Sequence, residues 1–324
     1  MLRQSPEDFQ VDEILGYAAD GAGEHCLVQL CKRNTNTEWL AVELARFAGV
    51  SRREVSYAGL KDRNAVTTQH FSVQLAGKPD PDWSAFPHPE VQILGSARHS
   101  RKLRRGALQA NRFVLVLRQV EGDLQAAEQR LAAIASQGVP NYFGDQRFGR
   151  EGGNIAQARA MFAGRRMRRA QRSILLSAAR SEIFNAVLHQ RVSDGNWNTA
   201  LDGELWCLSG SRSWFGPEAF NDDLQARLRA FDIHPSGPMW GRGALPSQAA
   251  CAALEQQSAA AYPEFTAGLA DAGLDQERRA LRLRPDHFQW QWLDDSSLQL
   301  SFELPPGAYA TSVMRELLAG AVVD

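Results

Sequence analysis

The residues best suited to chemistry lie in a short loop between two predicted strands. The stretch Gly59-Leu60-Lys61-Asp62-Arg63 places one acid between two cations. If the cations lie close to the carboxylate, they hold it ionised and lower its pKa. An ionised carboxylate can serve as a nucleophile or as a general base. Asp62 is therefore the candidate catalytic residue and Lys61 and Arg63 are its supporting cations, although a solvated turn with a local ion pair would show the same pattern.

Other common devices of enzyme chemistry are missing from the sequence. It contains no G-x-x-x-x-G-K-[ST] phosphate loop, no H-E-x-x-H and no G-x-S-x-G. The cysteines are too few for a disulfide framework and lack partners at metal-ligand spacing: Cys26, Cys31, Cys207 and Cys251. No apolar run approaches the ~18 residues of a membrane span. We expect a reduced, cytoplasmic protein with no metal, no cofactor and no membrane contact.

Basic residues cluster, although the formal net charge is only -1. The segment from Arg98 to Arg105 holds five cations and no acid, and the segment from Arg147 to Arg172 holds eight arginines against one acid. A local positive field attracts a polyanion whatever the net charge of the chain. Solvated helix and loop faces are the alternative explanation. The clustering favours a nucleic-acid partner.

The elements that must position these residues differ between the ends and the middle of the chain. Alternating apolar and polar residues predict strands near both ends, and Thr37 is predicted to cap the first helix. The predicted strands are Pro6–Leu15, His25–Lys32, Val55–Gly59, Gln69–Leu75, Val91–His99, Arg112–Val120, Phe288–Trp292 and Leu298–Leu304. The predicted helices are Thr37–Ala48, Leu124–Ser136, Ser173–Arg191 and Ser312–Leu318, with a loop-rich stretch over 195–243.

The chain of 324 residues exceeds the size at which single cores stop growing, roughly 250–300 residues. The pattern predicts a sheet domain built from residues 1–137 plus 286–324, with a mainly helical domain, 138–285, inserted in a surface loop. The alternative is two successive domains that divide near residue 138. In that arrangement a two-stranded C-terminal piece would stand alone, which is marginally stable.

Five motifs in order along the chain resemble those of the tRNA pseudouridine synthase D family. The longest is SYAGLKDRNAVTTQ, which surrounds Asp62. The others are PEDF at Pro6–Phe9, GAL at Gly106–Leu108 leading to Asn111 and Phe113, PNYFGDQRFG at Pro140–Gly149, and GAYATS at Gly307–Ser312. The resemblance therefore covers nearly the whole chain.

The resemblance implies an α+β pseudouridine synthase fold: a mixed, largely antiparallel sheet flanked by helices, with an inserted family-specific domain. It implies isomerisation of a uridine in tRNA, at position 13 of the D arm, without a cofactor. The implied partner is tRNA. No protein partner is implied, and we expect a monomer.

The resemblance also assigns roles to residues. Asp62 matches the family's catalytic aspartate, which could attack the sugar C1′, attack C6 of the base, or remove a proton from the sugar; the sequence leaves all three routes open. Phe9, Asn111 and Tyr309 match residues that contact the flipped nucleotide, and Phe113 matches an aromatic residue near the base. The added hydroxyl of Tyr309, where phenylalanine also occurs, needs a partner if buried.

Further residues complete the expected site. Arg3 stands where the family usually has an active-site lysine, and it keeps the charge with a different shape. The basic clusters become predicted tRNA phosphate contacts, at Arg98, Arg101, Arg104, Arg165 and Arg168.

Three other functions compete with this interpretation. An RNA-binding module that has lost catalysis would have no need of an intact Asp62 motif. The same enzyme acting on another RNA stays open, because the motifs reflect the chemistry better than the substrate. A glycoside hydrolase would need two carboxylates, and nothing in the sequence places Glu54 opposite Asp62.

Overall fold

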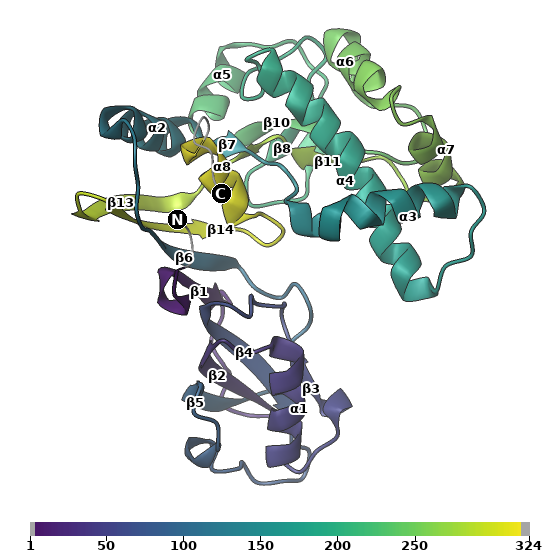
Figure 1. Ribbon diagram of the computed structural model, residues 1–324. Helices are drawn as coiled ribbons and strands as arrows, with labels where there is room; N and C mark the ends of the chain where they lie inside the picture. The colour runs from purple at the N-terminus through teal and green to yellow at the C-terminus, as the bar shows by residue number, and fades with distance from the viewer. Residues whose placement is uncertain (1–3, 319–324) are drawn as a thin grey trace. The chain divides into compact units, whose positions relative to one another are not determined.

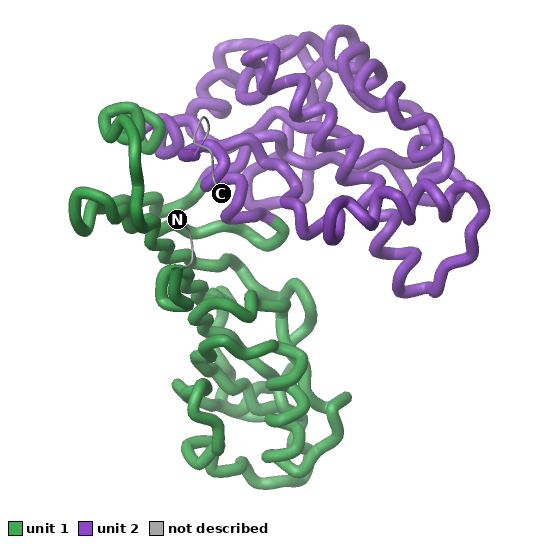
Figure 2. The backbone as a smooth tube through the Cα atoms, viewed as in Figure 1, with its two compact units in different colours: residues 1–131, 285–307, 320–324 green, residues 132–284, 308–319 purple. Residues whose placement is uncertain are grey.

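The computed structural model describes residues 4–318, which form two compact units (Figure 2). Unit 1 comprises residues up to 131 together with 285–307, and unit 2 comprises 132–284 together with the described residues from 308 onward. No helix of the described residues combines the length and the apolar character needed to cross a bilayer.

Unit 1 is built on a sheet that has eight strands among the described residues (Figure 1). The strand order is β13-β14-β6-β1-β4-β2-β5, and β3 pairs with β4. Every pair is antiparallel except β1–β4, which is parallel, so the sheet is mixed. The strands are β1 (Phe9–Ile14), β2 (His25–Arg33), β3 (Val55–Tyr57), β4 (Val66–Gln74), β5 (Val91–His99), β6 (Ala110–Leu117), β13 (Asp286–Asp294) and β14 (Ser297–Leu304).

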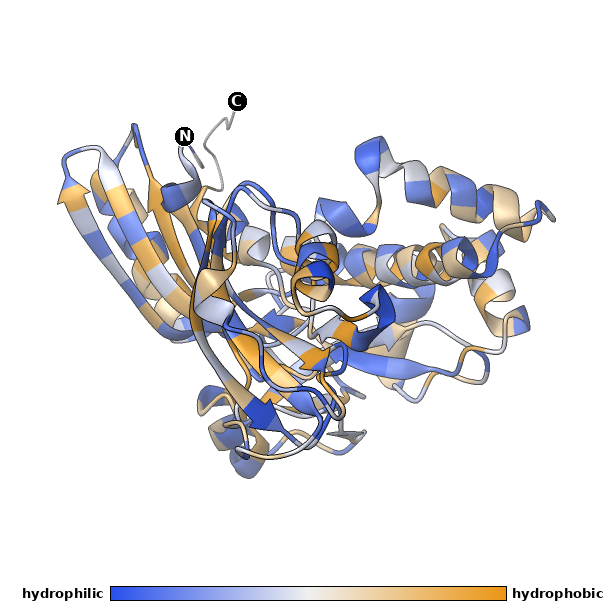
Figure 3. Cartoon of the chain, turned by 90° about the horizontal axis from the view of Figure 1, so that it is seen from below, coloured by the Kyte–Doolittle hydropathy of each residue, from blue (hydrophilic) through white to orange (hydrophobic). Residues whose placement is uncertain are grey.

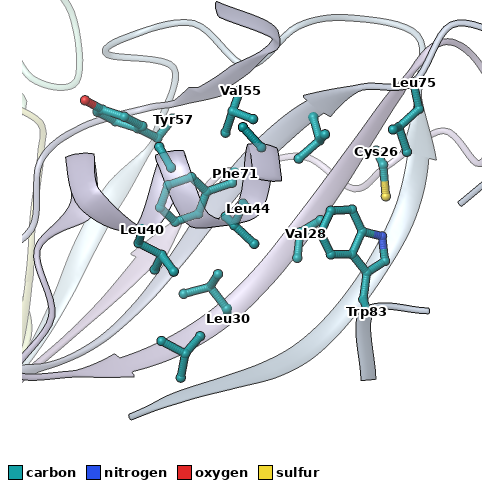
Figure 4. Close-up of a cluster of buried hydrophobic side chains, with 14 residues drawn as sticks. Cys26, Val28, Leu30, Leu40, Leu44, Val55, Tyr57, Phe71, Leu75 and Trp83 are labelled. Atoms are coloured by element: carbon teal, nitrogen blue, oxygen red, sulfur yellow. The ribbon is translucent and has the colours of Figure 1, made fainter. Parts of the chain in front are cut away.

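Helix α1 (Thr37–Phe47) covers part of one face of this sheet. Leu40 and Leu44 of α1 are fully buried in a core with Val28, Leu30 and Phe71 of the sheet (Figure 4). Along the strands, hydrophobic and hydrophilic residues alternate, as the bands of colour in Figure 3 show. This alternation is why local sequence predicted these strands.

The residue that caps α1 lies one position before the predicted one. Asn36, not Thr37, caps the helix, because its Oδ1 accepts hydrogen bonds from the backbone N of Glu38 and Trp39. Thr37 is the first helical residue, and its side chain is buried. It is therefore available to bind other parts of unit 1.

The strand after the Asp62 loop starts three residues earlier than predicted, at Val66 instead of Gln69. Residues Val66, Thr67 and Thr68 pair with Gln10, Val11 and Asp12 of β1. This partner lies far away in the sequence, so local alternation did not reveal the pairing. The loop is consequently shorter and is tied at both ends.

Helix α2 (Leu124–Gln137) begins in unit 1, where it contacts the C-terminal hairpin. Trp290 Nε1 and Trp292 Nε1 of β13 donate to the two carboxylate oxygens of Glu128, at 3.0 and 2.6 Å. The first and last segments of the chain thus belong to one sheet unit.

Unit 2 contains helices, as expected, and also two small sheets. The helices are α3 (Gly153–Phe162), α4 (Arg169–Ser193), α5 (Asp222–Arg229), α6 (Ala249–Ala259), α7 (Pro263–Asp271) and α8 (Ala310–Leu317). The four-stranded sheet has the order β11-β10-β8-β9, and β12 pairs with β7. The strands are β7 (Val139–Pro140), β8 (Trp206–Leu208), β9 (Trp214–Phe215), β10 (Ile233–Met239), β11 (Glu277–Ala280) and β12 (Arg282–Leu283).

The predicted loop-rich stretch over 195–243 also holds regular elements that the sequence did not reveal. It contains β8, β9, α5 and β10. Strand β10 includes Pro235 and Pro238, which normally argue against a strand, and it is buried on both faces, so it shows no alternation. The unit is a mixed one, less helical than the sequence suggested.

The compact units do not coincide with the predicted domain boundaries. The last helix packs in unit 2, where Ser312 Oγ donates to the carbonyl of Tyr142 at 3.1 Å, whereas we assigned it to the sheet domain. The division into a catalytic domain of residues 1–137 plus 286–324 and an inserted domain of residues 138–285 stays a prediction.

Candidate active site

Three predicted base contacts lie on one face of the unit 1 sheet. Strands β1 and β6 are paired so that Val11 faces Phe113 and Glu13 faces Asn111. Directly opposed residues of a ladder point to the same face, and residues two apart on one strand do as well. Phe9, Asn111 and Phe113 therefore share a face.

The aromatic side chains on this face contact one another. The Phe9 ring meets the edge of Phe113 at 6.2 Å between centroids, and Phe113 stacks on Phe302 at 5.5 Å. Phe9 is only 4% exposed, so much of its surface is already in the core. Phe113 is half-buried.

Asn111 has an unusual environment for an amide. Its Oδ1 is shielded from solvent and has no hydrogen-bond donor among the described residues. An unsatisfied buried acceptor costs about 1–3 kcal/mol. A bound molecule that offers an N–H at this position would remove that cost.

Buried side chains of β4 and α1 fix the backbone of the Asp62 loop. Gln69 Nε2 donates to the carbonyl of Gly59 at 2.6 Å, and Lys61 N donates to Thr37 Oγ1 at 3.2 Å. Thr37 Oγ1 in turn donates to Gln69 Oε1 at 3.1 Å. The backbone on the N-terminal side of Asp62 is therefore fixed at two points.

Lys61 takes a different partner from the one the local sequence suggested. Its Nζ donates to Glu13 Oε2 at 2.9 Å, and both side chains are buried. Burial pushes the pKa of Glu13 upward, but the hydrogen bond from His70 and the charge of Lys61 outweigh it, so the pKa of Glu13 lies below its usual value. Because Glu13 faces Asn111 across the ladder, this ion pair brings the Asp62 loop toward Asn111.

Lys32 of β2 is a site residue that our sequence analysis missed. Its side chain is fully buried, and its Nζ donates to the carbonyl of Thr35 at 2.7 Å and to that of Asp62 at 3.0 Å. Burial lowers the pKa of Lys32 to about 8, while the negative charge of Asp62 opposes part of that fall. The signal was present: Lys32 continues the buried series Val28 and Leu30 in an alternating strand.

The acid and its second neighbouring cation are more accessible than this framework. Asp62 is half-buried and Arg63 is exposed. The arrangement is a carboxylate on a loop whose backbone is fixed by buried groups, beside a sheet face that carries an amide and aromatic rings. It suits a reaction in which a planar ring is held while a carboxylate acts on an attached atom.

The predicted phosphate contacts fall into two groups. Arg98 is bound to its own unit: Nη2 donates to the carbonyl of Lys78 at 2.6 Å, Nη1 to that of Leu75 at 3.2 Å, and Nε lies 2.8 Å from Asp80 Oδ1. Arg98 therefore holds the segment after β4, and its role as a phosphate contact stays a prediction. The other predicted contacts are exposed: Arg101, Arg104, Arg165 and Arg168.

Tyr309 lies in unit 2, where two of the five motifs pack together. Its hydroxyl meets Arg147 Nη2 at 3.2 Å, and its ring meets the edge of Phe143 at 6.4 Å. At Gly144, a Cβ would come within 3.1 Å of Thr311 Oγ1, so this position favours glycine. Arg147 is the partner that the Tyr309 hydroxyl was expected to need. Arg3 lies outside the described residues.

Metal-ligating side chains do not gather in the described part of the chain. Over residues 4–318, no three His, Cys, Asp or Glu residues lie close enough together to hold an ion.

Comparison with known proteins identifies the family. The profile described as "tRNA pseudouridine synthase D" matches residues 1–158 and 154–317. The chain is 53% identical to a tRNA pseudouridine synthase D of Xanthomonas axonopodis pv. citri, with 100% of this chain and 92% of the relative aligned. It is 52% identical to one of Nitrosococcus oceani, with 98% and 90% aligned.

A solved structure shows that the fold is shared. The crystal structure of a Methanosarcina mazei protein, described as a candidate tRNA pseudouridine synthase D, matches with a TM-score of 0.76 over 98% of this chain and 93% of that one, at 22% identity. The predicted fold, a mixed and largely antiparallel sheet with helices, is confirmed. Given the match of profile, relatives and fold along nearly its entire length, this chain belongs to the tRNA pseudouridine synthase D family of isomerases.

Proposed function

We propose that this protein converts uridine 13 in the D arm of tRNA to pseudouridine without a cofactor, and that Asp62 is its catalytic residue. The observation that carries the proposal is the Lys61–Glu13 ion pair. It ties the loop that bears Asp62 to the strand position facing Asn111. This contact supports a position of the Asp62 carboxylate near the Asn111 amide, whose acceptor lacks a donor among the described residues.

The base-holding part of the face suits uracil. Uracil presents an N–H donor between two carbonyl acceptors, and the Asn111 amide offers the complementary acceptor and donor. The Asn111 Oδ1 that lacks a donor among residues 4–318 would accept from the uracil N3–H. The half-buried Phe113 is the aromatic residue proposed to stack on the base, an interaction worth roughly 1–3 kcal/mol per base. Phe9 and Tyr309 remain predicted contacts to the same nucleotide.

The reaction needs a carboxylate and no co-reactant. The bond between C1′ and N1 breaks, the uracil turns while bound, and a bond forms between C1′ and C5; the proton lost from C5 is balanced by one gained at N1. Asp62 can start this sequence by attack at C1′, by attack at C6, or by removing a sugar proton. The uridine must first leave its stack, at a cost of about a few kcal/mol.

The buried side chains around the loop fix the position of the Asp62 backbone. Lys32 binds its carbonyl, and Lys61, the next residue back, is tied to Glu13. We assign both lysines the role of positioning residues. Exposed Arg101, Arg104, Arg165 and Arg168 supply the proposed phosphate contacts, which orient the RNA without reading bases.

The experiment is to map pseudouridine, at single-nucleotide resolution, in an unmodified tRNA transcript incubated with the purified protein. We expect one pseudouridine at position 13, and we expect Asp62→Asn to slow its formation at least 10²-fold, because losing general-base help alone costs roughly 10²–10⁴. Asp295→Asn, an exposed acid in the same unit, is the matched control and should behave as wild type.

Three results would contradict parts of this proposal. Binding of tRNA without any pseudouridine would favour the RNA-binding alternative. Pseudouridine at another position, or in another RNA only, would contradict uridine 13. An Asp62→Asn variant within about tenfold of wild type would remove Asp62 from the chemistry. The cytoplasmic location and the monomeric state stay predictions.

A further inference from the structure

Unit 1 has an open pocket of about 850 Å³ whose aromatic side chains have no part in the proposed reaction. Tyr17 and His99 form one wall, and Arg101, Lys102 and Arg104 line the other parts. A volume of this size lies within the range of small-ligand sites, about 300–1,000 Å³. The combination of an aromatic wall with cations is the one that binds unpaired nucleotides.

The aromatic wall is exposed but held in place. The Tyr17 ring stacks on the His99 ring with centroids 5.5 Å apart and planes 23° apart, and Tyr17 is 43% exposed. The stack on His99 thus leaves part of Tyr17 accessible. An exposed, oriented ring face is a platform on which a base can stack at little entropic cost.

Hydrogen bonds between Asp20 and the segment His99–Ser100 hold part of the pocket lining in place. Asp20 accepts hydrogen bonds from the backbone N of Ser100, at 3.0 and 3.1 Å, and its own N lies 3.3 Å from His99 Nδ1. The hydrogen bond from the Ser100 hydroxyl is the largest of the effects that lower the pKa of Asp20 to about 2. The oxygens of this acid are thus occupied by local donors.

Two of the cations are available to a ligand. Within the described residues, the side chains of Arg101 and Arg104 have no hydrogen bond or ion pair, and both are exposed. By contrast, Lys102 Nζ donates to the carbonyl of Arg53 at 3.1 Å. Guanidinium groups without internal partners can bind phosphate oxygens in pairs.

The pocket is mechanically connected to the Asp62 loop. Gly106 N donates to the carbonyl of Ala58 at 2.7 Å, and Ser56 Oγ donates to that of Leu103 at 2.8 Å. Ala58 leads directly into the Asp62 loop, and the segment before Gly106 lines the pocket with Arg101, Lys102 and Arg104. The negative charge of Glu13, the partner of Lys61, adds to burial in raising the pKa of Tyr17.

We propose that this pocket binds an unpaired nucleotide of the same RNA that supplies the target uridine. Its base stacks on Tyr17, and its flanking phosphates contact Arg101 and Arg104. The nucleotide must be unpaired, because a base inside a helix has no free face for the platform. This inference rests on the proposed function and adds a second base-binding position to it.

The test is a binding cycle with the full chain and unmodified tRNA transcripts. Each transcript has the base of one unpaired nucleotide replaced by hydrogen. We expect Tyr17→Ala to weaken binding of the intact transcript about 5- to 150-fold, the equivalent of one lost stack. At one position, removal of the base should weaken binding to the wild-type protein by a similar factor. The same transcript should bind Tyr17→Ala as tightly as the intact transcript does.

Two further variants make the result specific. Tyr17→Leu keeps apolar cover over His99 without an aromatic face, so it should lose as much affinity as Tyr17→Ala. Trp39→Ala is the matched control: Trp39 is 42% exposed and also packs on a histidine, His88, but it does not line the basic pocket. It should bind as wild type does.

The proposal would be overturned if, at every unpaired position, removal of the base weakened binding by the same factor in wild type and in both Tyr17 variants. An affinity of both Tyr17 variants within about twofold of wild type would overturn it too. Because binding is measured without turnover, a protein that makes no pseudouridine can still show the coupling. A protein that makes pseudouridine normally can likewise fail to show it.

Discussion

Both units bury charged side chains, but these side chains have different partners. In unit 2, Arg191 pairs with Glu204 at 2.8 Å and Arg278 with Glu255 at 2.6 Å, all within the core. In unit 1, buried Lys32 binds the backbone of the Asp62 loop, which reaches the surface. The side chain of Lys61, a residue of that loop, is buried in a pair with Glu13.

The difference lies in what each ion pair orders. Around Glu204, the remaining oxygen positions accept backbone hydrogen bonds from Leu205 and Ser236, so the network is closed inside unit 2. A closed and fully hydrogen-bonded network rigidifies a core. In unit 1, the two lysines instead order the Asp62 loop, which has no hydrophobic core of its own. We therefore infer that buried charge serves the fold in unit 2 and the position of Asp62 in unit 1.

The largest effect on stability is expected in unit 2. Arg191→Met leaves Glu204 as an uncompensated buried charge, which should lower the free energy of unfolding by about 3–5 kcal/mol. Denaturant unfolding measures this change. The double variant Arg191→Met/Glu204→Leu should recover much of the loss, because removing both partners of a buried pair is often nearly neutral.

The control for this prediction is the exposed pair Arg242–Asp275 of the same unit, with side chains 62% and 70% exposed. Arg242→Met should change stability little. If the folded fraction of Arg191→Met has a lower single-turnover rate than wild type, the inference that this buried pair serves only the fold of unit 2 is wrong.

Lys32→Met should have the largest effect on turnover among the positioning residues. It removes the donor to the Asp62 carbonyl, and a misplacement of about 1 Å can cost on the order of 10² in rate. We expect the single-turnover rate of pseudouridine formation to fall by roughly that factor while the Kd for tRNA is unchanged. Lys78→Met, which removes an exposed lysine of the same unit, is the control. A loss of affinity equal to the loss of rate would show that Lys32 acts only through the stability of unit 1.

The pH dependence should separate the two units further. The pKa of Lys32 falls from 10.5 to about 8 on folding, so between these values the unfolded chain binds more protons than the folded one. Stability from this group therefore rises with pH over that window. The single-turnover rate should fall as the pH rises through about 8, because the folded protein then loses the ammonium that faces Asp62, Lys61 and Cys31.

In Lys32→Met, both changes should be absent, measured as unfolding free energy and single-turnover rate from pH 7 to 10. Persistence of the same rate profile in Lys32→Met would assign it to another group. Arg191→Met should keep the wild-type rate profile.

The smallest effect is expected at the surface of unit 2. Replacing Arg165 and Arg168 with Gln should weaken binding of unrelated RNAs alike and reduce the slope of log K against log salt by about 0.7–0.9 per contact. The single-turnover rate at saturating tRNA should stay the same. Binding at three salt concentrations measures the slope; an unchanged slope would mean that these arginines only solvate their surface.

Local sequence was sufficient wherever one side of an element meets the core. Strand β14 alternates buried and half-buried residues over Ser297–Leu304, and α4 places Ile183, Val187 and Leu188 in the core, so their periodicity reported the structure. The order of the five motifs predicted the family and the fold, which the comparisons confirm. The same motifs singled out Asp62 and Asn111, whose roles remain predictions.

Local sequence failed where burial is complete or where pairing is distant. Strand β10 is buried on both faces and contains Pro235, so neither alternation nor composition marked it. The true start of β4 depends on β1, whose pairing with Val66 begins at Gln10. No window of a few residues contains this information.

The sequence by itself determined which residue types are present and which local patterns they form: an acid between two cations, a lysine in an apolar strand, clusters of arginine, and five family motifs in order. Only the tertiary structure decided their partners. Lys61 pairs with Glu13, and Lys32 binds the carbonyl of Asp62. The side chain of Arg98 is hydrogen-bonded within its own unit, whereas Arg101 is exposed. These outcomes follow from the register between strands that are far apart in the chain, because register sets which side chains can reach each other, and a charged group binds the nearest group that restores the hydration it loses on burial.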